Sequence, residues 1–164
     1  MNRLPPLLLA LALIVTATVI VATMGLLRPI VPSHMRLDGR VDRWTPRDMY
    51  VAMMLAIGIG VPLLIVASTA LTRRLPPRWI NLPHREYWLA PERRERTHAT
   101  LHDFSCAIGT VVALFVAALH LLIVSGGSAR GAPPQPAFYV LLGVLVATLL
   151  GMVAWLLRRF CRPG

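Results

Sequence analysis

The stretch 31–44, VPSHMRLDGRVDRW, concentrates residues that can do chemistry between two long apolar runs. It holds His34, Asp38 and Asp42 at intervals of four residues. A histidine beside carboxylates can bind Zn²⁺ when other ligands complete the site, or it can respond to protons near neutral pH. The prolines and the glycine of the stretch argue against a helix, so only the folding of a loop could bring His34 and Asp42 together.

Two interpretations of this stretch compete. In the first, it is a ligand or partner site formed by Pro32, His34, Gly39, Asp42 and Trp44. In the second, the acids pair with loop arginines, Gly39 makes a turn with positive φ, and Trp44 anchors the loop at a membrane interface. The sequence favours the second interpretation and leaves the first open, together with a metal site.

A second candidate for metal chemistry is the series Glu95, His98 and His102, which falls on one helical face with Cys106 one turn further. The pattern Glu-x-x-His occurs in metal-binding helical bundles, although there several helices contribute ligands. Here one helix supplies all three residues. The alternative is the polar start of an interfacial helix that meets water, headgroups and neighbouring arginines.

His120 lies inside the third apolar run of the chain. Ionisable residues within membrane spans are functional candidates, since their burial in lipid is costly. His120 lies about one turn from the outer end of its span, where it could meet the loop 28–47. A neutral histidine bonded to a backbone carbonyl is the simpler interpretation.

The elements that must position these residues are membrane helices. With 56% hydrophobic residues and a mean hydropathy of +0.64, the chain is too apolar for an ordinary soluble domain. Four apolar runs are long enough to cross the bilayer, which takes roughly 20 helical residues: 4–27, 49–71, 101–124 and 137–157. We therefore expect an all-α integral membrane protein, a single bundle of four transmembrane helices over 1–164.

Local signals refine the helix boundaries. Thr45-Pro46 predicts the start of the second helix with Thr45 as its N-cap, and Pro91 with Glu92 predicts a helix that continues into the third span. In the second span, Gly58 and Gly60 predict close helix packing and Pro62 predicts a kink.

The arginines predict the orientation. All 17 basic residues are arginine, and eleven of them fall on the side that both termini share, against six on the other side. The positive-inside rule then places both termini and the loop 73–98 in the cytoplasm and the loop 28–47 outside. The net charge of +10 is explained by lipid headgroups, so we expect a bilayer and no nucleic acid as the partner.

Two signatures resemble a family of bacterial membrane proteins. The first is Pro-x-His-(aromatic)-Asn-x-x-Gly-x-x-Asp-x-(aromatic), which the stretch 31–44 matches except at Met35 and Arg36. The second is matched by NLPHREYWLAPE (81–92), where only His84 replaces an asparagine. The chain resembles domain-of-unknown-function family 1648, which is also found as the N-terminal part of SdpI-like immunity proteins.

The resemblance implies a four-helix membrane module in the bacterial inner membrane more strongly than it implies immunity. It adds candidate partner residues in the inner loop: Asn81, Pro83, Tyr87, Trp88, Pro91 and Glu92. No nucleophile, HExxH or P-loop motif is present in the sequence, so a non-enzymatic binding, sensing or immunity role without a cofactor is favoured. The partner would be an envelope-active peptide or another membrane protein. A metal-dependent membrane enzyme, a subunit of a larger transporter or assembly, and a homo-oligomer remain open.

Overall fold

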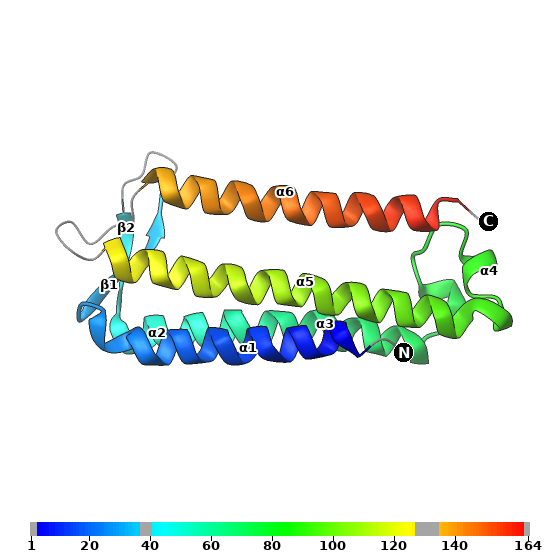
Figure 1. Cartoon of the computed structure of the whole chain (residues 1–164), viewed down its shortest axis with the longest axis horizontal. Helices are drawn as coiled ribbons and strands as arrows, with labels where there is room; N and C mark the ends of the chain where they lie inside the picture. Colours follow the sequence, from blue (N-terminus) through cyan, green and yellow to red (C-terminus); the bar gives the residue numbers. More distant parts are fainter. Residues whose placement is uncertain (1–2, 37–40, 127–134, 163–164) are drawn as a thin grey trace.

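The computed structural model describes residues 3–36, 41–126 and 135–162 of the chain, and these are mostly helical (Figure 1). Four helical segments are long and apolar enough to cross a membrane: Leu4–Leu26, Arg47–Arg74, Pro91–Gly126 and Pro136–Phe160. The prediction of four membrane-length helices is thus confirmed, and their length and composition indicate a multi-pass membrane protein. The described chain begins and ends at the same end of the bundle (Figure 1).

The first span is helix α1, Leu4–Thr23, extended by the 3-10 turn Met24–Leu26. Its two prolines occupy the first turn, where a missing N–H leaves no hydrogen bond unmade. After Leu27 the backbone becomes extended. Proline at position 29 disfavours a helical conformation of the residue before it, which explains the end of the helix there.

The segment between the first two spans is a β-hairpin, which the all-α prediction did not include. Strands β1, Ile30–Met35, and β2, Val41–Pro46, pair antiparallel. The sequence predicted a compact non-helical loop here. Paired strands satisfy the backbone hydrogen-bonding groups of such a segment internally. An irregular loop beside the membrane would leave more of these groups unpaired.

The second span begins at α2, Arg47–Leu55, so the predicted N-cap role of Thr45 is wrong. Thr45 belongs to β2, and its hydroxyl donates a hydrogen bond to Ser33 Oγ over 2.6 Å. The span continues through the π-helical turn Ala56–Gly60 into α3, Val61–Leu71, and the 3-10 turn Thr72–Arg74. Pro62 lacks an N–H and crowds the preceding turn, which accounts for the wide turn directly before it.

The rest of the chain forms two long helices and a short connection. The turn Pro77–Trp79 and the one-turn helix α4, Arg85–Trp88, lead to α5, which runs without a break from Pro91 to Gly126. The helix start predicted at Pro91 is therefore confirmed. Helix α6 spans Gln135–Phe160.

The packed core consists of α1, the second span and α5. A Cβ added at Gly58 would lie 3.0 Å from both Thr16 Cγ2 and Val116 Cγ1, so the glycine permits the close approach of three segments. Gly60 has no such neighbour within 4 Å, so the predicted close packing holds only at Gly58. The hydroxyl of Thr16 lies 2.9 Å from the carbonyl oxygen of Ala113 and thereby joins α1 to α5.

Helix α6 lies to one side of this core and packs on α5 (Figure 1). None of the 18 residues in its most apolar stretch is buried. The rings of Phe104 on α5 and Trp155 on α6 stack with centroids 6.1 Å apart. They border a groove of about 570 Å³ between the two helices. The fourth span is thus attached mainly through α5.

Candidate functional site

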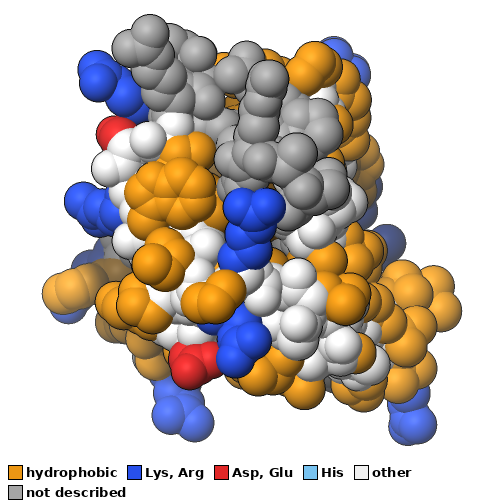
Figure 2. All heavy atoms as spheres, turned by 90° about the vertical axis from the view of Figure 1, so that its left-hand side faces the viewer, with side chains coloured by type: hydrophobic (Ala, Val, Ile, Leu, Met, Phe, Trp, Pro, Cys, Tyr) orange, Lys and Arg blue, Asp and Glu red, His pale blue; other side chains and the backbone are white. Residues whose placement is uncertain are grey.

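The polar residues gather at the two ends of the bundle. We call the β1–β2 hairpin and the helix ends beneath it the hairpin end. The opposite end, formed by residues 72–102 and 158–162, is called the arginine end. Figure 2 views the hairpin end and shows arginine side chains dispersed among hydrophobic ones, with few acidic groups between them.

Two irregularities in the pairing of the strands shape the hairpin. Pro32 pairs with Trp44 and Met35 with Val41, but between them His34 lies opposite Arg43. Ser33 on β1 and Asp42 on β2 are therefore the extra residues of two bulges that compensate each other. Such bulges alter the direction of side chains without a lasting shift of register.

The hairpin brings His34 and Asp42 together. Nδ1 of the histidine lies 2.6 Å from Oδ1 of the carboxylate, and both side chains are solvent-exposed, 62% and 42% respectively. Because an ionised carboxylate only accepts hydrogen bonds, Nδ1 carries the proton. The hydrogen bond from His34 holds the pKa of Asp42 below its ordinary value. Exposed pairs contribute little to stability, so this contact presents polar groups more than it supports the fold.

The other predicted residues of this loop have different surroundings. Pro32 is half-buried in β1, and Trp44 beside it is 49% exposed. Trp44 follows Asp42 by two residues in β2, so the hairpin carries an exposed apolar ring as well as the polar pair. Asp38 and Gly39 lie outside the described residues.

His120 is fully buried beneath the hairpin and has side-chain partners on two other segments. Its Nε2 lies 2.8 Å from Thr23 Oγ1, and its Nδ1 lies 3.5 Å from the hydroxyl of Tyr50. The Thr23 hydroxyl donates its single hydrogen to the carbonyl oxygen of Val19, so it must accept from His120 Nε2–H. Nδ1 then accepts from Tyr50. The expectation of a backbone carbonyl as the partner of His120 is therefore wrong.

This buried group connects the hairpin to the helices. The ring of Tyr50 stacks on His120 with centroids 5.8 Å apart. Tyr50 also belongs to the apolar cluster that includes Val31 at the base of the hairpin. The polar partners of His120 were not identified from the sequence. Two signals pointed to them: a buried histidine in a span requires hydrogen-bond partners, and Thr23 and Tyr50 both lie near the ends of spans.

At the arginine end, a conformational detail marks the segment 81–92. His84 has φ 50° and ψ 41°, which is the left-handed region, and its carbonyl accepts hydrogen bonds from the N–H groups of Tyr87 and Trp88. Asparagine and histidine are among the residues that tolerate this region. Exposed Asn81 and half-buried Tyr87 border a surface pocket of about 640 Å³, and Pro83 lies between them in sequence, half-buried.

Trp88 ties this segment to both long helices. Its indole N–H donates to the carbonyl oxygen of Phe160 at the end of α6 over 2.8 Å, and its own carbonyl accepts from the Thr97 hydroxyl on α5. Pro91 and Glu92 are exposed in the first turn of α5. Trp88 is therefore the structural link, while Glu92 faces the surroundings.

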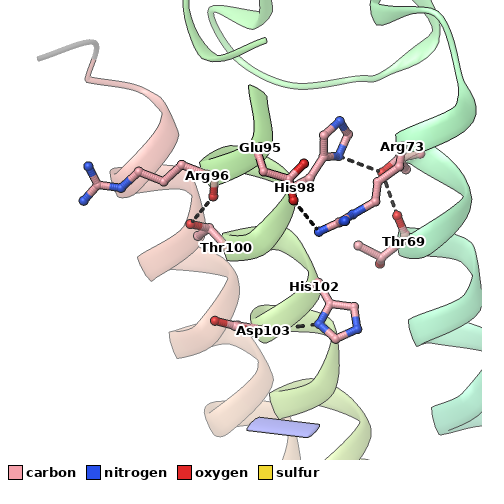
Figure 3. Close-up of polar contacts among 9 residues, drawn as sticks. Thr69, Arg73, Glu95, Arg96, His98, Thr100, His102 and Asp103 are labelled. Atoms are coloured by element: carbon pink, nitrogen blue, oxygen red, sulfur yellow. Dashed lines mark hydrogen bonds and ion pairs between the residues drawn. The ribbon is translucent and has the colours of Figure 1, made fainter. Parts of the chain in front are cut away.

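The structure does not bring Glu95, His98 and His102 together as a metal site (Figure 3). Glu95 pairs with Arg73 over 3.2 Å, and His98 lies 3.4 Å from the Thr72 hydroxyl. His102 lies nearest to Asp103 and Cys106. Among the described residues there is no group of three or more potential ligands placed to hold a metal ion.

Comparison with known proteins gives no match to a family model, a curated protein or a solved structure.

Proposed function

We propose that this protein is a non-enzymatic module of the bacterial inner membrane that recognises an extracytoplasmic partner at its hairpin. The observation that carries the proposal is the exposed His34–Asp42 contact of 2.6 Å on a hairpin with a buried base. The pair can donate and accept hydrogen bonds, and Trp44 beside it adds an apolar contact. A peptide active on the cell envelope, or an outer segment of another membrane protein, offers matching groups.

The arginine distribution supports the required orientation. Eleven of the 17 arginines fall on the side of the termini, so the positive-inside rule directs the hairpin outward. The resemblance to the SdpI-like proteins implies a four-helix membrane module, and a recognition role is proposed by analogy with these proteins. His84 has a left-handed backbone conformation, which the asparagine of the second signature would adopt readily at the same position.

A continuous chain of contacts could carry the effect of a partner through the membrane. The base of the hairpin packs on Tyr50, which contacts His120 on α5. Helix α5 is unbroken to Pro91, and at its other end Thr97 holds the backbone of Trp88. A shift of α5 at the hairpin end therefore reaches Tyr87, Trp88 and Glu92. Such a shift is the proposed signal to the cytoplasmic side.

The proposal is tested by photocrosslinking from position 44 in growing cells, followed by identification of the adducts. We expect an adduct with an extracytoplasmic peptide or protein, whose yield falls roughly tenfold in His34→Ala and in Asp42→Ala. Asp48→Ala is the matched control, because Asp48 is an exposed acid of the same end, 85% accessible, whose ion-pair partner is Arg47. Equal yields in all variants at equal expression would refute the proposed site. Tolerance of cells to the captured peptide then separates immunity from sensing.

A second candidate function is a subunit of a larger membrane assembly. The unburied face of α6 and its groove against α5 favour it, since small residues such as Gly143 and Gly151 on α6 permit another helix to approach. Extraction in a gentle detergent distinguishes the cases by mass: a monomeric particle would exclude a stable assembly. The described residues offer no observation in favour of a metal-dependent enzyme.

A further inference from the structure

A small basic pocket lies where α4, the start of α5 and the end of α6 meet at the arginine end. Its volume is about 170 Å³, and its charged side chains are Arg93, Arg96 and Arg159. Among the described residues, no acidic side chain lines it. The arginines come from two different helices, so the pocket exists only because the chain folds these helix ends together.

The framework of the pocket is fixed by bonds that do not involve the arginines. The Trp88 indole donates to the Phe160 carbonyl, and the two rings meet edge to face with centroids 5.2 Å apart. The hydroxyl hydrogens of Thr97 and Thr100 are both committed to backbone carbonyls. The positively charged donors that line the pocket are the guanidinium groups, which bind anions and not cations.

The same end contains arginines that already have partners, and these make a useful contrast. Arg73 pairs with Glu95, while Arg94 donates to the carbonyl of Arg73. Figure 3 shows Arg96 extending to the opposite side of α5 from this group. Within the described residues neither Arg96 nor Arg159 has an acidic partner, and Arg93 rests over the Tyr87 ring at 4.0 Å from its centroid.

We propose that this pocket binds the phosphate group of an anionic phospholipid. Guanidinium groups bind phosphate through paired N–H donors, and basic pockets between transmembrane helices suit anionic headgroups. The pocket lies at the ends of two membrane-length helices and is bordered by Tyr87 and Trp88, rings that favour the membrane interface. A lipid headgroup is delivered to this position by the bilayer, whereas free phosphate must come from water. This inference does not depend on the role of the hairpin.

Native mass spectrometry of the purified full chain tests the proposal. The protein is equilibrated in mixed micelles of phosphatidylglycerol and phosphatidylcholine with matched acyl chains, and the retained lipids are counted. We expect wild type to retain phosphatidylglycerol preferentially. We expect the preference for phosphatidylglycerol to fall roughly five- to tenfold in Arg159→Gln, and by a similar factor in the separate variant Arg96→Gln. Arg158→Gln is the matched control, because Arg158 is exposed on the adjacent position and does not line the pocket.

Three results would overturn the proposal. The first is equal retention of both lipids by wild type, and the second is an equal loss of preference in Arg158→Gln and Arg159→Gln. The third is displacement of the lipid by millimolar inorganic phosphate without selection between lipids, which would identify a soluble anion as the ligand. Thermal unfolding of each variant in detergent identifies any that fails to fold, and in that case Arg159→Lys, which keeps the charge and loses the paired donors, replaces it.

Discussion

The two ends of the molecule each bury one histidine of α5, and the two histidines differ in their surroundings. His120 at the hairpin end is 0% exposed and has partners on both ring nitrogens. His98 at the arginine end is 3% exposed, has one weak contact to Thr72 at 3.4 Å, and its buried Nε2 has no described partner. The hydrogen bonds of the buried histidine are thus complete at the hairpin end and incomplete at the arginine end. The hairpin end also has one buried polar atom without a hydrogen-bond partner among the described residues, Nε of Arg47.

The two candidate sites also differ in their charged groups. At the hairpin end, the exposed histidine and aspartate pair with each other across the two strands. At the arginine end, the pocket arginines have no acidic partner among the described residues. The first end presents a defined pair on a fixed support, and the second keeps positive charge available for a ligand. The proposed recognition surface and the proposed anion-binding pocket therefore lie at opposite ends of the molecule.

The largest effect on the free energy of unfolding is expected in the core that supports the hairpin. Gly58→Ala places a methyl group 3.0 Å from Thr16 and Val116, so overpacking should lower the free energy of unfolding by about 1–3 kcal/mol. A Cβ added at Gly143 on α6 would have no neighbour within 4 Å. Gly143→Ala should therefore leave the free energy of unfolding unchanged or raise it slightly. Unfolding in detergent measures both. Equal losses in the two variants would show that α6 is packed as tightly as the core.

The two buried histidines provide the next test. His120→Phe leaves the Tyr50 hydroxyl without its acceptor and should lower the free energy of unfolding by about 1 kcal/mol. His98→Phe removes a buried nitrogen that has no described partner, so the change should be near zero or stabilising. The same unfolding assay applies. A larger loss for His98→Phe than for His120→Phe would reverse the comparison.

The smallest effect is expected at the exposed pair. The hydrogen bond from His34 lowers the pKa of Asp42, so in His34→Ala this pKa should rise toward the ordinary value of 3.8. Because the folded-state value is the lower one, the stabilising contribution of the pair is present above pH 3.8 and is lost as the pH falls through the folded-state pKa. Carbon NMR of the Asp42 carboxyl group follows the titration. An unchanged pKa of Asp42 in His34→Ala would show that the hydrogen bond between the two side chains is not formed.

Local sequence signals accounted for much of the fold. The lengths of the apolar runs determine four membrane helices, and Pro91 marks the start of α5 because proline is suited to the first helical turn. The start of α2 was predicted less well. The hydroxyl of Thr45 donates to Ser33 Oγ on the opposite strand, and a partner twelve residues away in sequence cannot be read from a capping pattern.

The candidate site depended even more on tertiary structure. Residue types and loop composition allowed His34 and Asp42 to meet, but the pairing of two strands was needed to place them 2.6 Å apart. The partners of His120 and the convergence of Arg96 with Arg159 arise from contacts between distant helices. Such contacts depend on which faces pack, and apolar runs that are hydrophobic all round do not reveal this.

The most direct test of the account is the sidedness of its two ends. Cys161 is a free, exposed thiol at the arginine end, and Cys106 is buried. Trp44→Cys in a Cys161→Ser background places a thiol on the hairpin instead. An impermeant maleimide applied to intact spheroplasts should label position 44 and leave Cys161 unlabelled until the membrane is permeabilised. Labelling of Cys161 but not of position 44 in intact spheroplasts would contradict an outward-facing recognition hairpin.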